Sequence, residues 1–281
     1  MWRNIVLAGR VSKERIITGA LLILLCAAAI ILGGWFAAIC AYVGLLATAF
    51  DALRAFKAAG YKVLWPVVLI TAVLMLPAYM LLDLTGVCIL LAVSVVLTLC
   101  AAVFVRKSDF LDVMLTLFLL MYPVLPASML LFIACGRNQD MTQIFLAMTL
   151  ILPSACDSIA YFMGISLGKK KLCPEISPKK TVAGCIGAFL GGTFFGLIMG
   201  LIVNRFFWQG IPLVHFVAIG FASGFFSQVG DLSASMLKRF CGIKDFGRYL
   251  PGHGGALDRL DSIIINAVLI FIYSRIMIYI L

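Results

Sequence analysis

The segment from Val63 to Leu82 reads VLWPVVLITAVLMLPAYMLL and contains no charged residue. A helix of about 20 apolar residues is long enough to cross the hydrocarbon core of a bilayer, which is about 30 Å thick. Runs of the same kind recur along the chain, and they are continuous. A membrane β-barrel would instead show strands of about ten residues with alternating polarity. The segment therefore predicts an all-α, polytopic integral membrane protein.

The composition of the whole chain supports the same class. Of its 281 residues, 64% are hydrophobic and only 12% are charged, which is too apolar for a soluble domain of this size. The net charge of +10 would suit a nucleic-acid-binding protein, but basic residues that orient membrane helices explain it better. We therefore expect a lipid bilayer as the partner and no nucleic acid. The nine cysteines show no metal-ligand spacing, so we interpret them as small buried apolar residues.

Nine apolar runs are long enough to be membrane-spanning helices. We predict spans at about 16–33, 34–50, 63–82, 85–105, 110–134, 142–167, 182–203, 211–232 and 260–280. Together they form a single membrane-embedded domain over residues 1–281, with N-terminal helices in 16–134 and the polar motifs in 142–281. The first run follows a basic segment and could be a signal peptide, but the many later spans favour an uncleaved helix.

The distribution of Lys and Arg predicts the orientation of these spans. Alternation from a cytoplasmic N-terminus places 19 of the 22 Lys and Arg on the cytoplasmic side. Those residues lie in 1–15, 51–62, 106–109, 168–181 and 233–259. This bias satisfies the positive-inside rule, and it fixes an odd number of spans. We expect a multi-pass protein of a bacterial-type cytoplasmic membrane.

The seventh predicted span, 182–203, contains a series of glycines at intervals of one or four residues. They are Gly187, Gly191, Gly192, Gly196 and Gly200. Small residues let helix backbones approach closely in membranes, so we predict close helix packing rather than a ligand site.

Polar residues gather in one stretch near the C-terminus. Residues 231–261 read DLSASMLKRFCGIKDFGRYLPGHGGALDRLD and hold four Asp and five Lys or Arg. Charges beside apolar spans are costly unless they meet an opposite charge. Carboxylates suit a metal ion, and lysines and arginines suit phosphate. The stretch is therefore the predicted functional site.

Four aspartates are the candidates for metal or substrate contact. Asp258 and Asp261 are three residues apart and share one face of the last predicted helix, and Asp231 ends the preceding helix on the same side. Such carboxylates could hold one or two Mg²⁺ ions, although acidic residues also favour a helix N-terminus for electrostatic reasons alone. Asp157 lies inside the sixth span, where it is either hydrogen-bonded for structural reasons or faces a polar cavity.

Several short motifs within these segments resemble a known family. They are Ser235-Met236-Leu237-Lys238-Arg239, Lys244-Asp245, Pro251-Gly252-His253-Gly254-Gly255 and Asp258-Arg259-Leu260-Asp261. In this order and spacing they resemble the C-terminal motif of the phosphatidate cytidylyltransferases, also called CDP-diacylglycerol synthases. A second resemblance comprises Asp157-Ser158 and Ser177–Thr181. The sequence departs from the family at Ala183, where a Glu is common, and at Ala256, where a larger apolar residue is usual.

The resemblance implies a nucleotidyltransferase of phospholipid biosynthesis. Its reaction is CTP plus phosphatidate giving CDP-diacylglycerol plus pyrophosphate, with Mg²⁺ and a site that faces the cytoplasm. It implies that Asp231 and Asp258 are metal ligands, with Asp261 as a third. The catalytic set also includes Lys238, Arg239 and His253, with His253 contacting a phosphate or bracing the loop ahead of acting as a base. The implied substrate-binding residues are Asp157, Ser177, Lys179, Lys180, Thr181, Ser235, Lys244, Asp245, Gly254, Gly255 and Arg259.

Three alternatives remain open from the sequence. A transporter or channel with a charged cytoplasmic mouth fits Asp157 and the glycine-rich helices. An enzyme that uses CTP on another lipid fits the same motifs. An inactive homologue would fit the departure at Ala183. The sequence also leaves open whether the protein forms a homodimer.

Overall fold

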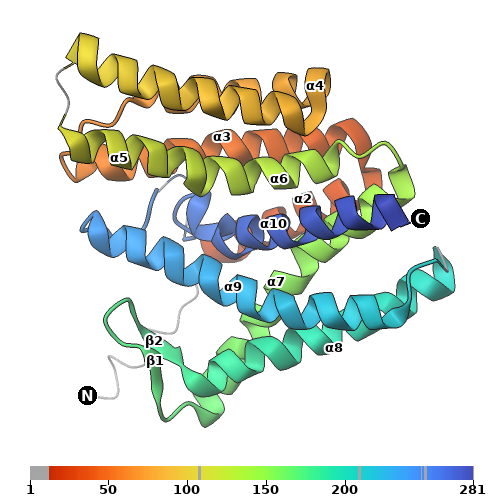
Figure 1. Ribbon diagram of the computed structural model, residues 1–281. Helices are drawn as coiled ribbons and strands as arrows, with labels where there is room; N and C mark the ends of the chain where they lie inside the picture. The colour runs from red at the N-terminus through yellow and green to blue at the C-terminus, as the bar shows by residue number, and fades with distance from the viewer. Residues whose placement is uncertain (1–12, 107–108, 208–209, 248, 250–251, 281) are drawn as a thin grey trace, which may run out of the picture.

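The structure is a computed structural model that describes residues 13–106, 109–207, 210–247, 249 and 252–280. The predicted N-terminal segment with Arg3 and Arg10, and Pro251 of the motif, lie outside the described residues. Helices account for nearly all of the described chain, which confirms the all-α class (Figure 1). The helices are α2 (Lys13–Leu32), α3 (Gly34–Ala58), α4 (Trp65–Cys100), α5 (Phe110–Leu119), α6 (Leu125–Ala134), α7 (Gln139–Leu167), α8 (Val182–Phe206), α9 (Leu213–Phe240) and α10 (Leu257–Ile280).

Helix α4 is a hairpin of two antiparallel limbs. The hydroxyls of Thr71 and Ser94 lie 2.6 Å apart, whereas 23 residues of straight helix would separate them by about 35 Å. The chain reverses at Asp83, whose φ of 54° and ψ of −143° are not helical. Gly86 lies directly against the carbonyl of Ala78, where a side chain would clash. The two limbs correspond to the predicted spans 63–82 and 85–105.

Seven helical segments of the described residues are long and apolar enough to cross a membrane. They are Gly34–Ala58, Trp65–Phe104, Phe110–Ala134, Gln139–Leu167, Val182–Phe206, Leu213–Phe240 and Leu257–Met277. This count treats the α4 hairpin as one helix and leaves out the shorter apolar segment Ile16–Leu32. A π-helical turn, Leu120–Val124, joins α5 to α6 within one of these segments.

The helices form layers with α10 at the centre. Helices α3, α4, α5 and α6 lie on one side, at the top of Figure 1, and α8 and α9 lie on the other. Helix α10 packs between them against α9, α6, α7 and α3. Its buried apolar residues Ile264, Ala267 and Ile270 are completely shielded from solvent. The central position of α10 explains why its polar residues can meet side chains from several other helices.

Glycines bring α7, α8 and α9 into close contact. Gly192 of α8 packs directly on the Gly220 carbonyl of α9, and Gly220 packs in turn on the Gly192 carbonyl. Gly196 lies against the Phe216 carbonyl, and Gly187 and Gly191 lie against α7. Any larger residue would force these backbones apart. The predicted close packing of the seventh span is therefore confirmed.

The polar connections gather at one end of the molecule. The end of α3, the end of α9, the start of α10 and the hairpin of β1 (Lys171–Cys173) and β2 (Ser177–Thr181) all lie at the left of Figure 1. The turn at Asp83 and the connections 135–138 and 210–212 lie at the opposite end. The fold thus brings together the two segments that carry the motifs, 157–181 and 231–261.

Candidate functional site

Three aspartates from three helices form what we term the acidic cluster. Asp157 of α7, Asp231 of α9 and Asp261 of α10 lie close enough for each carboxylate to interact electrostatically with the other two. Asp261 is only 8% exposed. Ser262 links the cluster, because its side chain hydrogen-bonds to Asp157 and its backbone N–H donates to Asp261 Oδ1 at 2.7 Å. Like charges this close make the cluster a favourable place for a cation.

One lysine enters the acidic cluster from the hairpin. Lys180 Nζ lies 2.7 Å from Asp231 Oδ2 and donates to Gln228 Oε1 at 3.1 Å. The side chain of Lys180 is 16% exposed, so the pair is only partly screened by solvent. A single lysine in direct contact leaves the three carboxylates short of positive charge. The acidic cluster therefore carries excess negative charge.

Gly230 sets the distance between α9 and α10 at this point. A side chain there would meet the carbonyl of Asp261 and the Cα of Ser262. The absent side chain allows the two helices to touch, and so it places Asp231 beside Asp261.

The carboxylate of Asp258 holds the loop that precedes α10. Its Oδ1 is 2.8 Å from Lys238 Nζ, and its Oδ2 accepts hydrogen bonds from the backbone N–H groups of Phe246 at 2.8 Å and Gly255 at 3.0 Å. The Asp258 side chain is only 5% exposed. Both oxygens are therefore engaged with protein groups, and the carboxylate fastens both ends of the loop to α10.

A second buried carboxylate, which the sequence analysis missed, holds the same loop. Asp51 of α3 is completely buried, and its Oδ2 accepts from the Tyr249 hydroxyl at 2.7 Å and from the Leu257 N–H at 3.0 Å. The Tyr249 hydroxyl accepts in turn from the Ala256 N–H at 2.8 Å. Burial, and then the bond to Asp51, raise the pKa of Tyr249, so the phenol stays a donor. We term Asp51 and Asp258 the anchor carboxylates.

A sequence signal for Asp51 did exist. It is an acidic residue within one turn of an apolar run, where an ionisable side chain needs a partner. Its partners, Tyr249 and Leu257, are about 200 positions away in the chain, and only the fold reveals them.

Tyr122 is a further residue that the sequence analysis missed. It lies where the helix breaks between α5 and α6, with a φ of −150° and a ψ of 119°. Its ring is 8% exposed, and its buried hydroxyl has no hydrogen-bond partner among the described residues. The hydroxyl interacts electrostatically with Asp261, Asp231 and Asp258. A fourth structural element therefore directs an unused polar group toward the carboxylates.

The aspartates fit a hard divalent cation in chemical type but are not arranged around one. Carboxylate oxygens are the ligands that Mg²⁺ prefers. Within the described ranges, however, no group of three His, Cys, Asp or Glu side chains has the geometry to hold a metal ion. Asp231 pairs with Lys180, and Asp258 is fully engaged. The metal-ligand assignment of Asp231, Asp258 and Asp261 stays a prediction. To bind a metal ion, Asp258 would have to release Lys238 or share one oxygen between the ion and its present partners.

The comparison with protein families settles the relationship of the chain. The profile described as the cytidylyltransferase family matches residues 13–277, which is nearly the whole sequence. The chain belongs to the cytidylyltransferase family.

Curated relatives refine this placement among cytidylyltransferases. The chain is similar to the phosphatidate cytidylyltransferase of Bacillus subtilis, with 45% identity over 140 residues that cover 49% of each chain. It is similar to that of Staphylococcus saprophyticus, with 47% identity over 106 residues, or 38% of this chain and 39% of the relative. It is also similar to the phosphatidate cytidylyltransferase of Thermotoga maritima, with 38% identity over 128 residues, or 43% of this chain and 45% of the relative. The aligned part of the chain thus spans at most about half the length of these relatives.

The remaining predicted residues of the cytidylyltransferase motif divide into two groups. Some support the backbone: Thr181 Oγ1 caps α8 by accepting from the Gly184 N–H at 3.1 Å. Gly254, with a φ of 83°, packs against Asp258, and Gly255 packs against Asp51. Ser235 is buried on α9, one turn after Asp231. The glycines therefore make room for the anchor carboxylates of the protein itself.

The second group consists of side chains at the surface. Lys179, Lys244, Asp245, Arg239 and Arg259 are exposed, and Ser177 is half-buried on β2. Arg259 Nε donates to the His253 carbonyl at 2.8 Å, and Arg239 Nε reaches the Ile176 carbonyl at 3.4 Å. These guanidinium groups keep further donors for a ligand.

His253 and the two departures from the family pattern have structural settings. The His253 ring lies beside Gly19 of α2, and its Nδ1 is buried without a partner among the described residues. Ala183 is half-buried in the first turn of α8, and Ala256 donates its N–H to Tyr249. The bracing role considered for His253 agrees with this packing, while its role toward substrate stays a prediction.

Proposed function

We propose that the protein transfers the cytidylyl group of CTP to phosphatidate, giving CDP-diacylglycerol and pyrophosphate. The observation that carries the proposal is the acidic cluster at one end of a layer of apolar helices, bordered by Lys180, Lys238 and the exposed basic residues. A lipid substrate needs apolar helices beside the reacting group, and a nucleoside triphosphate needs positive charge. Family membership and the names of the relatives support the same reaction.

The reaction requires one bond to form and one to break at phosphorus. A phosphate oxygen of phosphatidate attacks the α-phosphorus of CTP, and the bond from that phosphorus to the β-phosphate oxygen breaks. Pyrophosphate leaves with the electron pair of that bond. The phosphatidate phosphate is largely dianionic near neutral pH, so no protein base is required. Positioning and electrostatic stabilisation by lysines and arginines would supply most of the rate enhancement.

The basic residues around the cluster have distinct places in this scheme. Lys180 and Lys238 are half-buried and already face carboxylates, so they would hold phosphate oxygens once a cation relieves those pairs. Arg239, Lys244 and Arg259 are exposed and would attract the triphosphate and the leaving group. Asp231 and Asp261, with Asp157 nearby, would hold Mg²⁺. The ion would neutralise negative charge on the phosphates.

The membrane arrangement follows from the same features. We infer nine crossings, with α2 and both limbs of α4 counted, and a cytoplasmic N-terminus. The connections rich in Lys and Arg lie at one end of the molecule, which supports this orientation (Figure 1). The acidic cluster lies at that end. CTP would reach it from the cytoplasm and the lipid would reach it from the bilayer.

The decisive experiment measures turnover by the purified protein in detergent. Phosphatidate and labelled CTP are supplied with and without Mg²⁺, and both pyrophosphate and CDP-diacylglycerol are quantified. We expect formation of both products in equal amounts, dependent on lipid and metal. Asp261→Asn serves as the inactive control, and Glu175→Gln, at the exposed tip of the hairpin, serves as the matched charge control.

Other outcomes would redirect the assignment. Pyrophosphate release with another lipid acceptor, in a panel of isoprenoid alcohols and ether lipids, would show a different substrate. The absence of pyrophosphate with every acceptor, in a folded sample, would contradict the proposed reaction and return the transporter and the inactive homologue to consideration.

A further inference from the structure

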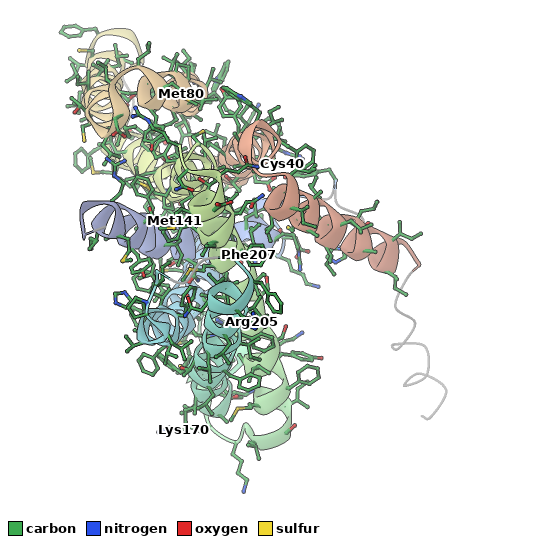
Figure 2. All side chains as sticks on the ribbon, turned by 90° about the vertical axis from the view of Figure 1, so that its right-hand side faces the viewer. Cys40, Met80, Met141, Lys170, Arg205 and Phe207 are labelled. Carbon is green, nitrogen blue, oxygen red and sulfur yellow. The ribbon has the colours of Figure 1, made fainter. Side chains whose placement is uncertain are left out.

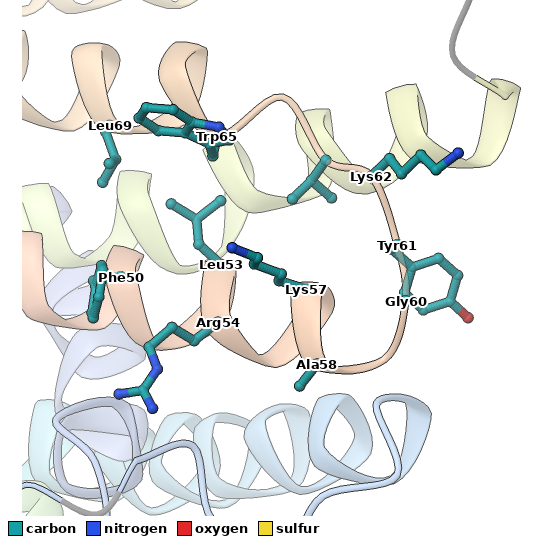
Figure 3. A pocket seen from close by; sticks show the side chains of 11 residues that line it. Phe50, Leu53, Arg54, Lys57, Ala58, Gly60, Tyr61, Lys62, Trp65 and Leu69 are labelled. Carbon is teal, nitrogen blue, oxygen red and sulfur yellow. The ribbon is translucent and has the colours of Figure 1, made fainter.

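A basic pocket lies between α3 and α4, apart from the acidic cluster. It has a volume of about 860 Å³ and is bounded by the last turns of α3, the connection to α4 and the start of α4 (Figure 3). Phe50, Arg54 and Lys57 lie on one face of α3 at helical spacing, and Trp65 and Leu69 face them from α4.

Among the described residues, no acidic side chain forms an ion pair with the cations of this pocket. Arg54, Lys57 and Lys62 line it, no acidic residue does so, and none of the ion pairs among the described residues involves them. Arg54 lies over the Phe50 ring at 5.8 Å. Asp51, one turn earlier, is buried and bonded to Tyr249 and Leu257. The pocket therefore carries three positive charges and no acidic side chain among the described residues that line it, although the Lys62 backbone N–H donates to Asp112 Oδ1 at 2.9 Å.

The apolar walls indicate what kind of anion would bind. Trp65 is 57% exposed and Phe50 is 50% exposed, although both lie beside the basic groups. A soluble anion would leave this apolar surface uncovered. Tryptophan and basic residues together are typical of the boundary between the hydrocarbon and the headgroups of a bilayer. A molecule with a phosphate head and an acyl chain would match both halves of the pocket.

We propose that this α3–α4 pocket binds an anionic phospholipid, separately from the acidic cluster. Lys57, which points into the space between α3 and α4, holds the phosphate, while Arg54 and Lys62 add positive charge at the edges of the pocket (Figure 3). The first part of an acyl chain lies on Phe50, Trp65 and Leu69. The site requires only a phosphate-bearing lipid, so it stands whether or not the proposed transfer reaction is correct.

Fluorescence of Trp65 tests the proposal without any turnover. The chain has four tryptophans, and replacing Trp2, Trp35 and Trp208 by Phe leaves Trp65 as the only one. Lipids with brominated acyl chains quench a tryptophan that they contact. We expect brominated phosphatidate and phosphatidylglycerol in nanodiscs to quench Trp65 at a lower mole fraction than brominated phosphatidylcholine.

Charge variants identify the residues responsible. The combined change Arg54→Gln, Lys57→Gln and Lys62→Gln should weaken anionic lipid binding by about fivefold for each cation removed, the usual effect of one basic residue at an anionic surface. Lys57→Arg with Lys62→Arg should retain the preference, because the charge is kept. Loss of the preference in this conservative variant would mean that packing, not charge, creates it, and it would overturn the proposal.

A matched control distinguishes lipid binding in the α3–α4 pocket from general attraction of anionic lipids to positively charged residues. Lys169, Lys170 and Lys171 also supply three positive charges, and Lys170 projects away from the helices (Figure 2). Their replacement by Gln should leave the quenching of Trp65 by anionic lipid unchanged. Equal quenching by anionic and zwitterionic lipids, or equal loss in the control, would overturn the proposal.

Discussion

The acidic cluster and the anchor carboxylates lie at the same end of the molecule but differ in how many protein groups contact their carboxylates. Asp258 accepts hydrogen bonds from one lysine and two backbone amides, and Asp51 accepts two hydrogen bonds. In the acidic cluster, three carboxylates face one another with Lys180 as the one cation in direct contact among the described residues. Asp258 is thus paired through both oxygens and Asp51 through Oδ2 alone, since its buried Oδ1 has no partner among the described residues, whereas the second group has one lysine for three carboxylates.

This difference separates residues that hold the site from residues that would act in it. A carboxylate that the fold satisfies stabilises the fold, whereas carboxylates held close together without sufficient partners store repulsion that a bound cation would relieve. The motif residues of the sequence thus serve two purposes. Substitutions in the two groups should affect turnover and stability in different proportions.

The largest effect should come from the acidic cluster. Asp261→Asn removes one charge from the cluster and should lower turnover about a thousandfold, because several kcal/mol of metal-dependent stabilisation would be lost. The thermal unfolding midpoint should stay the same or rise, since repulsion is reduced. Initial rates and thermal unfolding in detergent measure both. A large fall in stability with little change in rate would show that Asp261 is structural.

The anchor carboxylates should give the opposite pattern. Asp51→Ala leaves the buried Leu257 N–H without an acceptor and should lower stability by about 3 kcal/mol. Asp51→Asn is the matched control, because its amide oxygen can still accept, and it should recover most of this loss. Equal destabilisation by the two variants would show that the negative charge, rather than the hydrogen bonds, matters at this position.

Gly230→Ala should disturb the acidic cluster most, and it should also strain the Lys238–Asp258 ion pair, which joins the same two helices. The added methyl meets the Asp261 carbonyl, so α9 and α10 must separate at a cost of about 1–3 kcal/mol. Turnover should fall because Asp231 moves away from Asp261. Rate measurements together with thermal unfolding test this, and unchanged turnover would show that the spacing of the two helices is not critical.

Tyr122→Phe should have the smallest effect and the clearest interpretation. The hydroxyl has no partner among the described residues, so its loss should leave stability unchanged or slightly increased. If the hydroxyl contacts a ligand held at the carboxylates, turnover should fall about tenfold, the value of one hydrogen bond. Wild-type kinetics in this variant would exclude such a contact.

The sequence predicted the parts of the fold that depend on local pattern. Continuous apolar runs located the helices, including the reversal between 63–82 and 85–105. The glycine spacing in 182–203 correctly predicted close packing, because small residues have few other uses in such a helix. Asp157, Asp231 and Asp261 were selected as unpaired charges beside apolar spans, and the structure brings them together.

The parts that failed depend on contacts between distant segments. Asp51 and Tyr122 lie in apolar helices, and nothing near them in the sequence shows that they face 249–261. The family resemblance places Gly254 and Gly255 among the substrate-binding residues, yet in the structure they pack against the carboxylates of Asp258 and Asp51. A sequence pattern shows that a glycine-rich backbone can approach another group closely. It does not show whether that group belongs to a ligand or to the protein itself.

The α4 hairpin has a consequence for how the protein can evolve. Only 17% of its most apolar window is buried within the chain, against 72% for the segment from α5 to α6. Most side chains in that window are therefore not buried within the chain. In a saturation mutagenesis screen, the exposed positions of α4 outside the lipid pocket should accept most apolar replacements, whereas its buried Val68, Ala72 and Met75, like α5 and α6, should reject many. The exposed side of this hairpin is thus freer to vary than α5 and α6, and changes in its apolar length would accommodate bilayers of different thickness.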